Sequence, residues 1–317
     1  MSFAEDLFAR MLDGEMADAE IAAVLVEMAD RGETAEDVVG AVRAMRARMI
    51  PVKAPANAID VCGTGGDGQH SLNISTTVAI VVAACGVPVA KHGNRAASSK
   101  AGTADTLEAL GLNLVNASAR AEQTLADLNI AFFFAQAHHP ALGRIAPIRK
   151  NLGRRTIFNL IGPLANPAQV TRQLVGVPSP ELVPLYRDAM SMLGTEAALI
   201  VSGEEGLDEL SIAGPSRMAG IGLSGLDERM TPEEAGLQRH SLEALRGGDA
   251  AFNAAALRRL LEGEAGAYRD AVLLNAAGAL IVAGEAQNWR DGAAQAAEAI
   301  DTGLAKELLN SWIAAVS

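Results

Sequence analysis

From Ala58 onward, short apolar runs alternate with segments of helical periodicity, and this alternation restricts the fold more than any other feature of the 317-residue sequence. Continuous apolar strands that alternate with helices are typical of a parallel sheet covered on both faces. We therefore expect an α/β architecture with a mostly parallel central sheet. The predicted strands are 58–62, 86–93 with its exit loop, 130–134, 173–177 and 197–202, and the predicted helices between them are 75–85, 104–110, 119–128 and 180–193.

The two ends of the chain have a different pattern. Residues 3–48 show apolar positions at spacings of three and four, with Gly14 and Gly32 at the breaks, which predicts three short amphipathic helices. Residues 51–57 are rich in Pro and predict a linker, and 241–317 predicts a mainly helical region. Because one core rarely grows beyond roughly 250–300 residues, we expect one large domain and one small helical domain.

The overall composition excludes several classes of function. A net charge of −12 argues against a broad nucleic-acid or anionic-membrane surface, because phosphate groups are held by clustered Lys and Arg. The longest apolar run, 78–90, is shorter than the roughly 20 residues of a membrane span. We expect no signal peptide, and reduced thiols at Cys62 and Cys85 in a cytoplasmic protein.

The segment GTGGDGQHSLNIST, residues 63–76, follows the first predicted strand, and we call it the glycine loop. Glycines at a strand end allow close backbone approach to a ligand, and N–H groups at the following helix start favour an anion. A turn-rich connector is the simpler alternative. Gly63, Gly65 and Gly68 also fit the dinucleotide fingerprint, but there the helix opens at the third glycine, whereas polar residues here continue to Asn73.

The segment KHGNRAASSKAGTAD, residues 91–105, is the basic segment. It places Lys91, Arg95 and Lys100 among small and hydroxylated residues, a pattern that favours phosphate binding. The alternative is a solvated surface loop. We expect His92, taken on its own, to have a structural rather than a catalytic role.

Asp208 and Glu209 form an acidic pair after the last predicted strand. Mg²⁺ is usually bound by one or two carboxylates together with substrate phosphates, so the pair is a candidate metal site beside two phosphate loops. As an isolated pattern it favours solvated carboxylates. Glu204 and Glu205 precede Gly206 and predict an exposed turn.

Residues 147–167 carry Arg149, Arg154 and Arg155 on what we expect to be one basic helix face. Such a face could bind an aromatic carboxylate, or it could be an ordinary charged surface. His138 and His139 have no carboxylate or Cys at metal spacing, so no zinc site is expected.

Taken together, these motifs resemble those of anthranilate phosphoribosyltransferases. The chain has GTGGD at 63–67, NIST at 73–76, KHGNRAASS at 91–99, HHP at 138–140, RTIFNLIGPLANP at 155–167 and GLDEL at 206–210, in the family's order. The resemblance extends over roughly residues 10–310. It departs at 214–232, which is short where the family often has a hairpin, and at Ser71, where the family commonly has Thr.

The resemblance implies a set of site residues. Phosphoribosyl pyrophosphate (PRPP) would be bound by Gly63, Gly66, Asp67, Ser71, Asn73, Ile74, Ser75, Thr76, Lys91, His92, Gly93, Asn94, Arg95, Ala96, Ala97, Ser98, Ser99 and Thr103. Ser75, Asp208 and Glu209 would ligate Mg²⁺, and Gly63, Asn94 and Arg149 would contact anthranilate. No residue would act as acid or base, and Lys91, Asp208 and Glu209 would contribute electrostatically.

The resemblance also implies the activity and the assembly. The phosphoribosyl group of PRPP would pass to the amine of anthranilate, giving N-(5-phosphoribosyl)anthranilate and pyrophosphate, the second step of tryptophan biosynthesis from chorismate. The small helical domain would hold 1–52 and about 140–170, and the α/β domain would hold 53–139 and about 171–317. The family usually forms homodimers through the helical domain.

Two rival functions make different predictions. A pyrimidine nucleoside phosphorylase shares the fold but lacks the KHGN and RTIFN patterns. A non-catalytic relative that binds nucleic acid would have lost the glycine loop and gained basic surface, neither of which fits this sequence.

Overall fold

The structure is a computed structural model that describes residues 2–96 and 100–317. Within them, a seven-stranded sheet has the order β3-β2-β1-β4-β5-β6-β7. Strands β1 to β5 are parallel, while β6 and β7 add an antiparallel edge. The strands are β1 (Ile59–Gly63), β2 (Val89–Gly93), β3 (Ile130–Phe134), β4 (Arg172–Gly176), β5 (Ala197–Gly203), β6 (Ser216–Ile221) and β7 (Arg229–Met230). All five predicted strands are confirmed, and the sheet is mostly parallel as expected.

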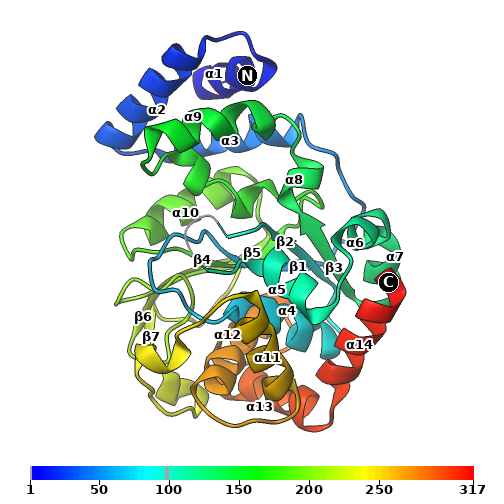
Figure 1. Cartoon of the computed structure of the whole chain (residues 1–317). Helices are drawn as coiled ribbons and strands as arrows, with labels where there is room; N and C mark the ends of the chain where they lie inside the picture. Colours follow the sequence, from blue (N-terminus) through cyan, green and yellow to red (C-terminus); the bar gives the residue numbers. More distant parts are fainter. Residues whose placement is uncertain (1, 97–99) are drawn as a thin grey trace.

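Three helices open the chain, as predicted, and lie at one end of the molecule (Figure 1). They are α1 (Phe3–Asp13), α2 (Asp18–Arg31) and α3 (Ala35–Arg46). Gly14 ends α1 in the left-handed conformation at φ 82°, where glycine carries no steric penalty. Thr34 caps α3 in a reciprocal capping box with Asp37.

Most of the remaining helices surround the sheet, and the C-terminal ones gather on one side of it, whereas α9 lies beside the N-terminal helices (Figure 1). Those before β4 are α4 (Ile74–Ala84), α5 (Thr103–Leu110), α6 (Leu114–Ala119), α7 (Ala121–Leu128), α8 (Ala135–His138) and α9 (Leu142–Leu152). Those after β4 are α10 (Leu182–Met192), α11 (Ala250–Leu261), α12 (Ala267–Ala283), α13 (Trp289–Asp301) and α14 (Leu304–Val316). The predicted helix 119–128 is confirmed as α7, and α6, which ends just before it at Ala119, is an additional helix that the sequence did not predict.

The sheet separates two large apolar clusters, because successive strand residues point to opposite faces, and a smaller third cluster includes Ala90 and Phe133. Ile59 and Val61 of β1 pack with the buried sides of α4 and α11 to α14. Cys62 of the same strand and Val175 of β4 pack in a second cluster. That second cluster also contains buried residues of α1 to α3, α9 and α10. It therefore joins the N-terminal helices to the sheet.

One local expectation needs correction, and one region can now be described. Residues 147–167 are not one helix: α9 ends at Leu152 because Gly153 adopts the left-handed conformation, and short 3-10 turns follow. Arg154 and Arg155 therefore lie beyond the helix. The short region 214–232 still holds β6 and β7 as an antiparallel pair.

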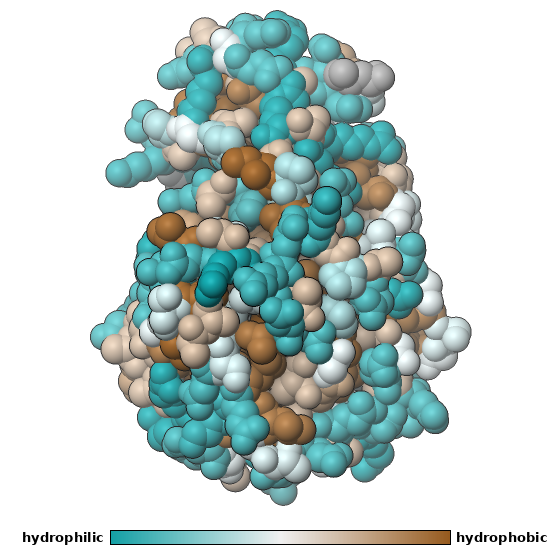
Figure 2. Space-filling model, turned by 90° about the vertical axis from the view of Figure 1, so that its right-hand side faces the viewer, coloured by the Kyte–Doolittle hydropathy of each residue, from teal (hydrophilic) through white to brown (hydrophobic). Residues whose placement is uncertain are grey.

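The surface is mostly hydrophilic on the face that Figure 2 shows, with small separate apolar patches. Among the described residues, the large hydrophobic side chains left exposed are Phe3, Ile50, Val115, Met192, Phe252 and Leu304. No helix in the described parts of the chain is both long and apolar enough to span a bilayer.

Candidate active site

The chain reverses its direction of sheet growth next to β1, which lies between β2 and β4. From β1 it builds β2 and β3 on one side, and it then crosses over to build β4 and β5 on the other. In open α/β sheets such a switch point leaves a crevice outside the carboxyl ends of the strands. Here those ends are Gly63 and Gly176, which pair with each other.

At the end of β1, where the glycine loop begins, there is no room for a side chain. A Cβ on Gly63 would lie 2.3 Å from Oδ2 of Asp208. Gly65 and Gly66 follow with φ of 70° and 76°, a region that favours glycine. The backbone N–H of Gly65 donates to Oδ2 of Asp208 at 2.6 Å. The glycines therefore allow the loop to fold directly over the acidic pair.

The acidic pair lies beneath this loop rather than in solvent. Asp208 and Glu209 are 8% and 7% exposed, and Oε1 of Glu209 accepts the backbone N–H of Ser75 at 3.2 Å. Burial raises the pKa of Asp208, and the neighbouring Asp67 carboxyl raises it further. Burial and then Asp208 raise the pKa of Glu209. Carboxylates held together at this cost are typical of a cation site.

The β4 end shows the same close fit. A Cβ on Gly176 would lie 1.6 Å from the backbone oxygen of Asp208, so only glycine allows the acidic pair to cross this strand. Glu204 and Glu205, by contrast, are exposed and lie in a turn after β5, as predicted.

Lys91 brings the basic segment to the same place. Its side chain is buried at 2% exposure, and Nζ donates to the backbone oxygen of Val61 at 2.6 Å and to Oγ of Ser75 at 3.3 Å. Its charge lowers the pKa of Glu209 and of Asp60 against the dominant effect of burial. The ammonium therefore offsets part of the negative charge around it.

A single cavity of about 690 Å³ joins the motifs. Residues of the glycine loop, the basic segment and the region from α9 to Pro163 all line it. Among them are Gly63, Thr64, Gly65, Gly66, Ser75, Lys91, His92, Gly93, Asn94, Arg95, Ala96, Gly102, Thr103, Arg149, Arg154, Arg155, Phe158 and Asn159. The acidic pair supports this wall from behind, through its bonds to Gly65 and Ser75.

Several residues expected at the donor site do not line the cavity. Ile74 is buried in the core, and Thr76 is buried with its Oγ1 3.2 Å from Oγ1 of Thr103. Oδ1 of Asn73 accepts bonds from Thr106 and Asn253, so this amide ties the loop to α5 and α11. Asp67 and Ser71 are also absent from the lining. The expected residues Ala97, Ser98 and Ser99 lie outside the described part of the chain.

The opposite wall carries the arginines. The half-buried Arg149 lies with its guanidinium carbon 5.6 Å from the ring centre of Phe158, and its Nη2 is 3.5 Å from Oδ1 of Asn159. Burial lowers the pKa of Arg149 from its ordinary value. The guanidinium nevertheless stays charged at neutral pH. Arg154 pairs with Asp30 of α2 at 2.6 Å, and Arg155 is exposed.

Two buried histidines face each other at the junction of the walls, and only one was expected there. The rings of His92 and His139 are 5.2 Å apart, and Nδ1 of His92 contacts the backbone oxygen of Gly162 at 3.1 Å. Burial lowers the pKa of His92 to about 3 and that of His139 to about 4, so both are neutral at pH 7. His92 nevertheless lines the cavity, so both its structural role and its contact with a donor stay predictions.

Asp60 is a further polar residue that the sequence did not single out, because its strand is otherwise apolar. It is fully buried, and its two oxygens accept the backbone N–H of His92 at 3.2 Å and Nδ2 of Asn166 at 2.8 Å. One carboxyl group thus connects the basic segment to residues 155–167.

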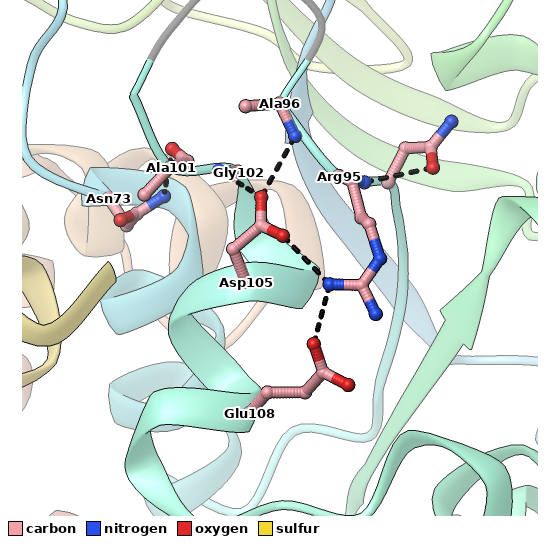
Figure 3. Close-up of polar contacts among 8 residues, drawn as sticks. Asn73, Arg95, Ala96, Ala101, Gly102, Asp105 and Glu108 are labelled. Atoms are coloured by element: carbon pink, nitrogen blue, oxygen red, sulfur yellow. Dashed lines mark hydrogen bonds and ion pairs between the residues drawn. The ribbon is translucent and has the colours of Figure 1, made fainter. Parts of the chain in front are cut away.

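Arg95 lies at the edge of the cavity, and its Nη1 contacts Oδ1 of Asp105 at 2.8 Å and Oε2 of Glu108 at 2.5 Å (Figure 3). The guanidinium also lies 5.6 Å from the ring centre of Phe134. In this conformation the side chain is directed toward α5.

The residues fit a magnesium ion bound together with a substrate. Within the described residues, no three His, Cys, Asp or Glu side chains are close enough to hold a metal by themselves. Mg²⁺ commonly relies on one or two carboxylates plus substrate phosphates and water, and the acidic pair supplies the carboxylates.

Comparison with known proteins assigns the family. Residues 55–306 match the model of the glycosyl transferase family a/b domain, and 3–49 match its helical bundle domain. An anthranilate phosphoribosyltransferase of Novosphingobium aromaticivorans is 66% identical over 314 residues, which cover 99% of this chain and 95% of the relative.

Solved structures agree. The anthranilate phosphoribosyltransferase of Thermus thermophilus superimposes with a TM-score of 0.94 at 42% identity, over 99% of this chain and 94% of that one. The Saccharomyces cerevisiae enzyme, solved in complex with PRPP and Mg, gives 0.89 at 28% identity, over 99% and 92%. The chain belongs to the anthranilate phosphoribosyltransferase family.

Proposed function

We propose that the chain transfers the phosphoribosyl group of PRPP to the amine of anthranilate, giving N-(5-phosphoribosyl)anthranilate and pyrophosphate in the tryptophan pathway. The observation that carries the proposal is the shared cavity, in which the glycine loop and basic segment form one wall and the arginines form the other. The yeast relative in complex with PRPP and Mg supports the donor and the metal, and its complex with 4-fluoroanthranilate supports the acceptor.

The donor would bind on the wall formed by the glycine loop and the basic segment. Gly63, Gly66, Ser75, Lys91 and Asn94 line it. Backbone N–H groups at the start of α4 and the Lys91 ammonium favour phosphate oxygens. Asp67, Ser71, Asn73, Ile74 and Thr76 would contribute by shaping the loop or through backbone groups.

The acidic pair and Ser75 would hold Mg²⁺ against the pyrophosphate of the donor. When bound, the ion neutralises charge on phosphoryl oxygens as a Lewis acid. Buried, mutually repelling carboxylates such as Asp208 and Glu209 are stabilised when a cation arrives, so ionisation and metal binding reinforce each other.

The acceptor would bind on the arginine wall. The carboxylate of anthranilate would pair with Arg149, whose charge is fixed and whose guanidinium rests against Phe158. Gly63 and Asn94 would contact the same molecule where the two walls meet.

The chemistry would require positioning more than proton transfer. The aryl amine of anthranilate is neutral at pH 7 and already nucleophilic, while the barrier lies at the departing pyrophosphate. Lys91 and the loop N–H groups would stabilise that departing charge in a site that excludes water. No residue is assigned as acid or base, which agrees with the low pKa of His92 and His139.

The test is to mix the full-length protein with anthranilate and PRPP and to follow the loss of anthranilate fluorescence, with and without Mg²⁺. We expect turnover only with both substrates and the metal. Thymidine with inorganic phosphate serves as the matched control. Cleavage of thymidine without anthranilate turnover would contradict the proposal and show that the protein is a nucleoside phosphorylase.

Two further parts of the proposal concern the oligomeric state of the protein and its location in the cell. We propose a small domain of 1–52 and about 140–170, through which two copies form a homodimer; Phe3, 85% exposed on α1, supports an interface there. We also propose a cytoplasmic location, which the unpaired Cys62 and Cys85 support. Sedimentation equilibrium tests the dimer.

A further inference from the structure

The two ends of the loop between β2 and α5 touch each other. A Cβ on Gly102 would lie 2.5 Å from the backbone nitrogen of Ala96 and 2.8 Å from the backbone oxygen of Asn94. The backbone N–H of Ala104 donates to the same oxygen of Asn94 at 3.2 Å. Ala96 and Gly102 both line the cavity, so the width of this loop base sets part of the cavity wall.

One carboxyl group holds both ends, as Figure 3 shows. Oδ2 of Asp105 accepts the backbone N–H of Ala96 at 3.0 Å and that of Gly102 at 2.9 Å. Its other oxygen, Oδ1, accepts from Nη1 of Arg95 at 2.8 Å. Asp105 itself does not line the cavity, so among the described residues it acts on the wall through these three partners.

The ionised form of Asp105 is the one that these partners favour. Although burial opposes ionisation, the N–H groups of Ala96 and Gly102 and the Arg95 guanidinium lower the pKa of Asp105 below its usual value. Hydrogen bonds to a charged acceptor are stronger than neutral ones, so this connection is among the firmer contacts of the loop.

Glu108, one helical turn later, offers a natural comparison. Its carboxylate contacts the same Nη1 of Arg95 at 2.5 Å and, among the contacts of the described residues, none to the loop backbone (Figure 3). Asp105 and Glu108 therefore share the guanidinium, but only Asp105 fixes the backbone. The two roles can be separated by substitution.

We propose that Asp105 is a positioning residue for the phosphorylated donor, which holds Ala96 and Gly102 together and so fixes the part of the donor wall that these two residues form. The inference rests on the proposed function, because it assumes that PRPP binds to this wall. Arg95 serves in part as the counter-ion that allows Asp105 and Glu108 to lie near a phosphate site without repelling the ligand.

The test compares Asp105→Ala, Asp105→Asn and Glu108→Gln in the full-length protein. Calorimetric titration with PRPP at saturating Mg²⁺ gives the dissociation constant, steady-state kinetics give KM for each substrate, and thermal unfolding reports folding. For Asp105→Ala we expect donor affinity to fall roughly thirtyfold, since two charge-assisted bonds to the loop backbone and the contact with Arg95 are lost. The KM for anthranilate should stay within about twofold, a split that a general loss of structure would not give.

The other two variants should lose less donor affinity than Asp105→Ala. Asn at position 105 can still accept both N–H bonds through its amide oxygen but loses the charge, so affinity should fall only about threefold. Glu108→Gln should stay within about twofold, because it loses only an exposed ion pair. If Asp105→Ala does not fold, a donor affinity of Asp105→Asn equal to that of Glu108→Gln overturns the inference.

Two failures can be told apart. If the wild-type protein binds no PRPP and turns over no anthranilate, the proposed function is wrong. If the wild type does both and Asp105→Ala binds PRPP within twofold of it, or weakens both substrates equally, Asp105 is not a positioning residue.

Discussion

The two walls of the cavity are built differently. The donor wall lies at the carboxyl edge of the sheet, where Lys91 and the acidic pair are nearly fully buried and bonded to neighbouring backbone. The arginine wall belongs to α9 and the turns after it, and Arg154 and Arg155 are exposed there. The donor wall thus places fixed charges in a low-dielectric setting, while the arginine wall offers charges that water screens. We expect substitutions on the two walls to differ in size and in the substrate they affect.

The largest effect is expected from Glu209→Ala on the donor wall. Removing one of the two buried carboxylates that we propose hold Mg²⁺ should lower kcat/KM about a thousandfold or more, as loss of a preorganised electrostatic group does. Turnover measured across a Mg²⁺ titration checks this, with Glu204→Ala in the exposed turn as control. Unchanged rates at limiting Mg²⁺ would remove Glu209 from the metal site.

Asp60, which connects the basic segment to residues 155–167, should make the stability of the protein depend on pH. Burial raises the pKa of Asp60 to about 6, above the value of roughly 3.9 in an unfolded chain. The folded state therefore holds this proton more tightly, and its stability falls as pH rises from about 4 to about 6, by on the order of 3 kcal/mol. In Asp60→Asn this contribution is absent.

Denaturant unfolding of the wild type and Asp60→Asn from pH 4 to pH 7 measures the difference. The wild type should lose stability relative to the variant as pH rises through this window. Parallel curves would show that folding does not raise the pKa of Asp60.

The arginine wall should give a smaller and more selective effect. Arg149→Ala should raise KM for anthranilate roughly tenfold to thirtyfold, about 1.4 to 2 kcal/mol, because a charge-assisted contact with the proposed acceptor carboxylate is lost. KM for PRPP should stay within about twofold. Steady-state kinetics with each substrate varied test this, with Arg144→Ala on the same helix as control. An equal rise in both KM values would erase the distinction between the walls.

The sequence alone was sufficient for the five parallel strands and for the meeting of the three motifs at one edge of the sheet. The glycine loop, basic segment and acidic pair each follow a predicted strand, and carboxyl ends of parallel strands meet at one edge, so local sequence implies their proximity. The ordered motifs also indicated the family, and 66% identity to an enzyme of that family confirms it.

Tertiary structure alone decided how each residue is used. Asn73 and Thr76 look like phosphate ligands in the sequence, yet their side chains bond to α5 and α11. Asp60 and Asp105 carried no local signal, because their partners come from elsewhere along the chain or from loop backbone. Residues 147–167 predicted a basic helix, which Gly153 ends in the structure. Periodicity and composition describe a segment and its neighbours, whereas the partner of a buried polar atom depends on which distant segment packs against it.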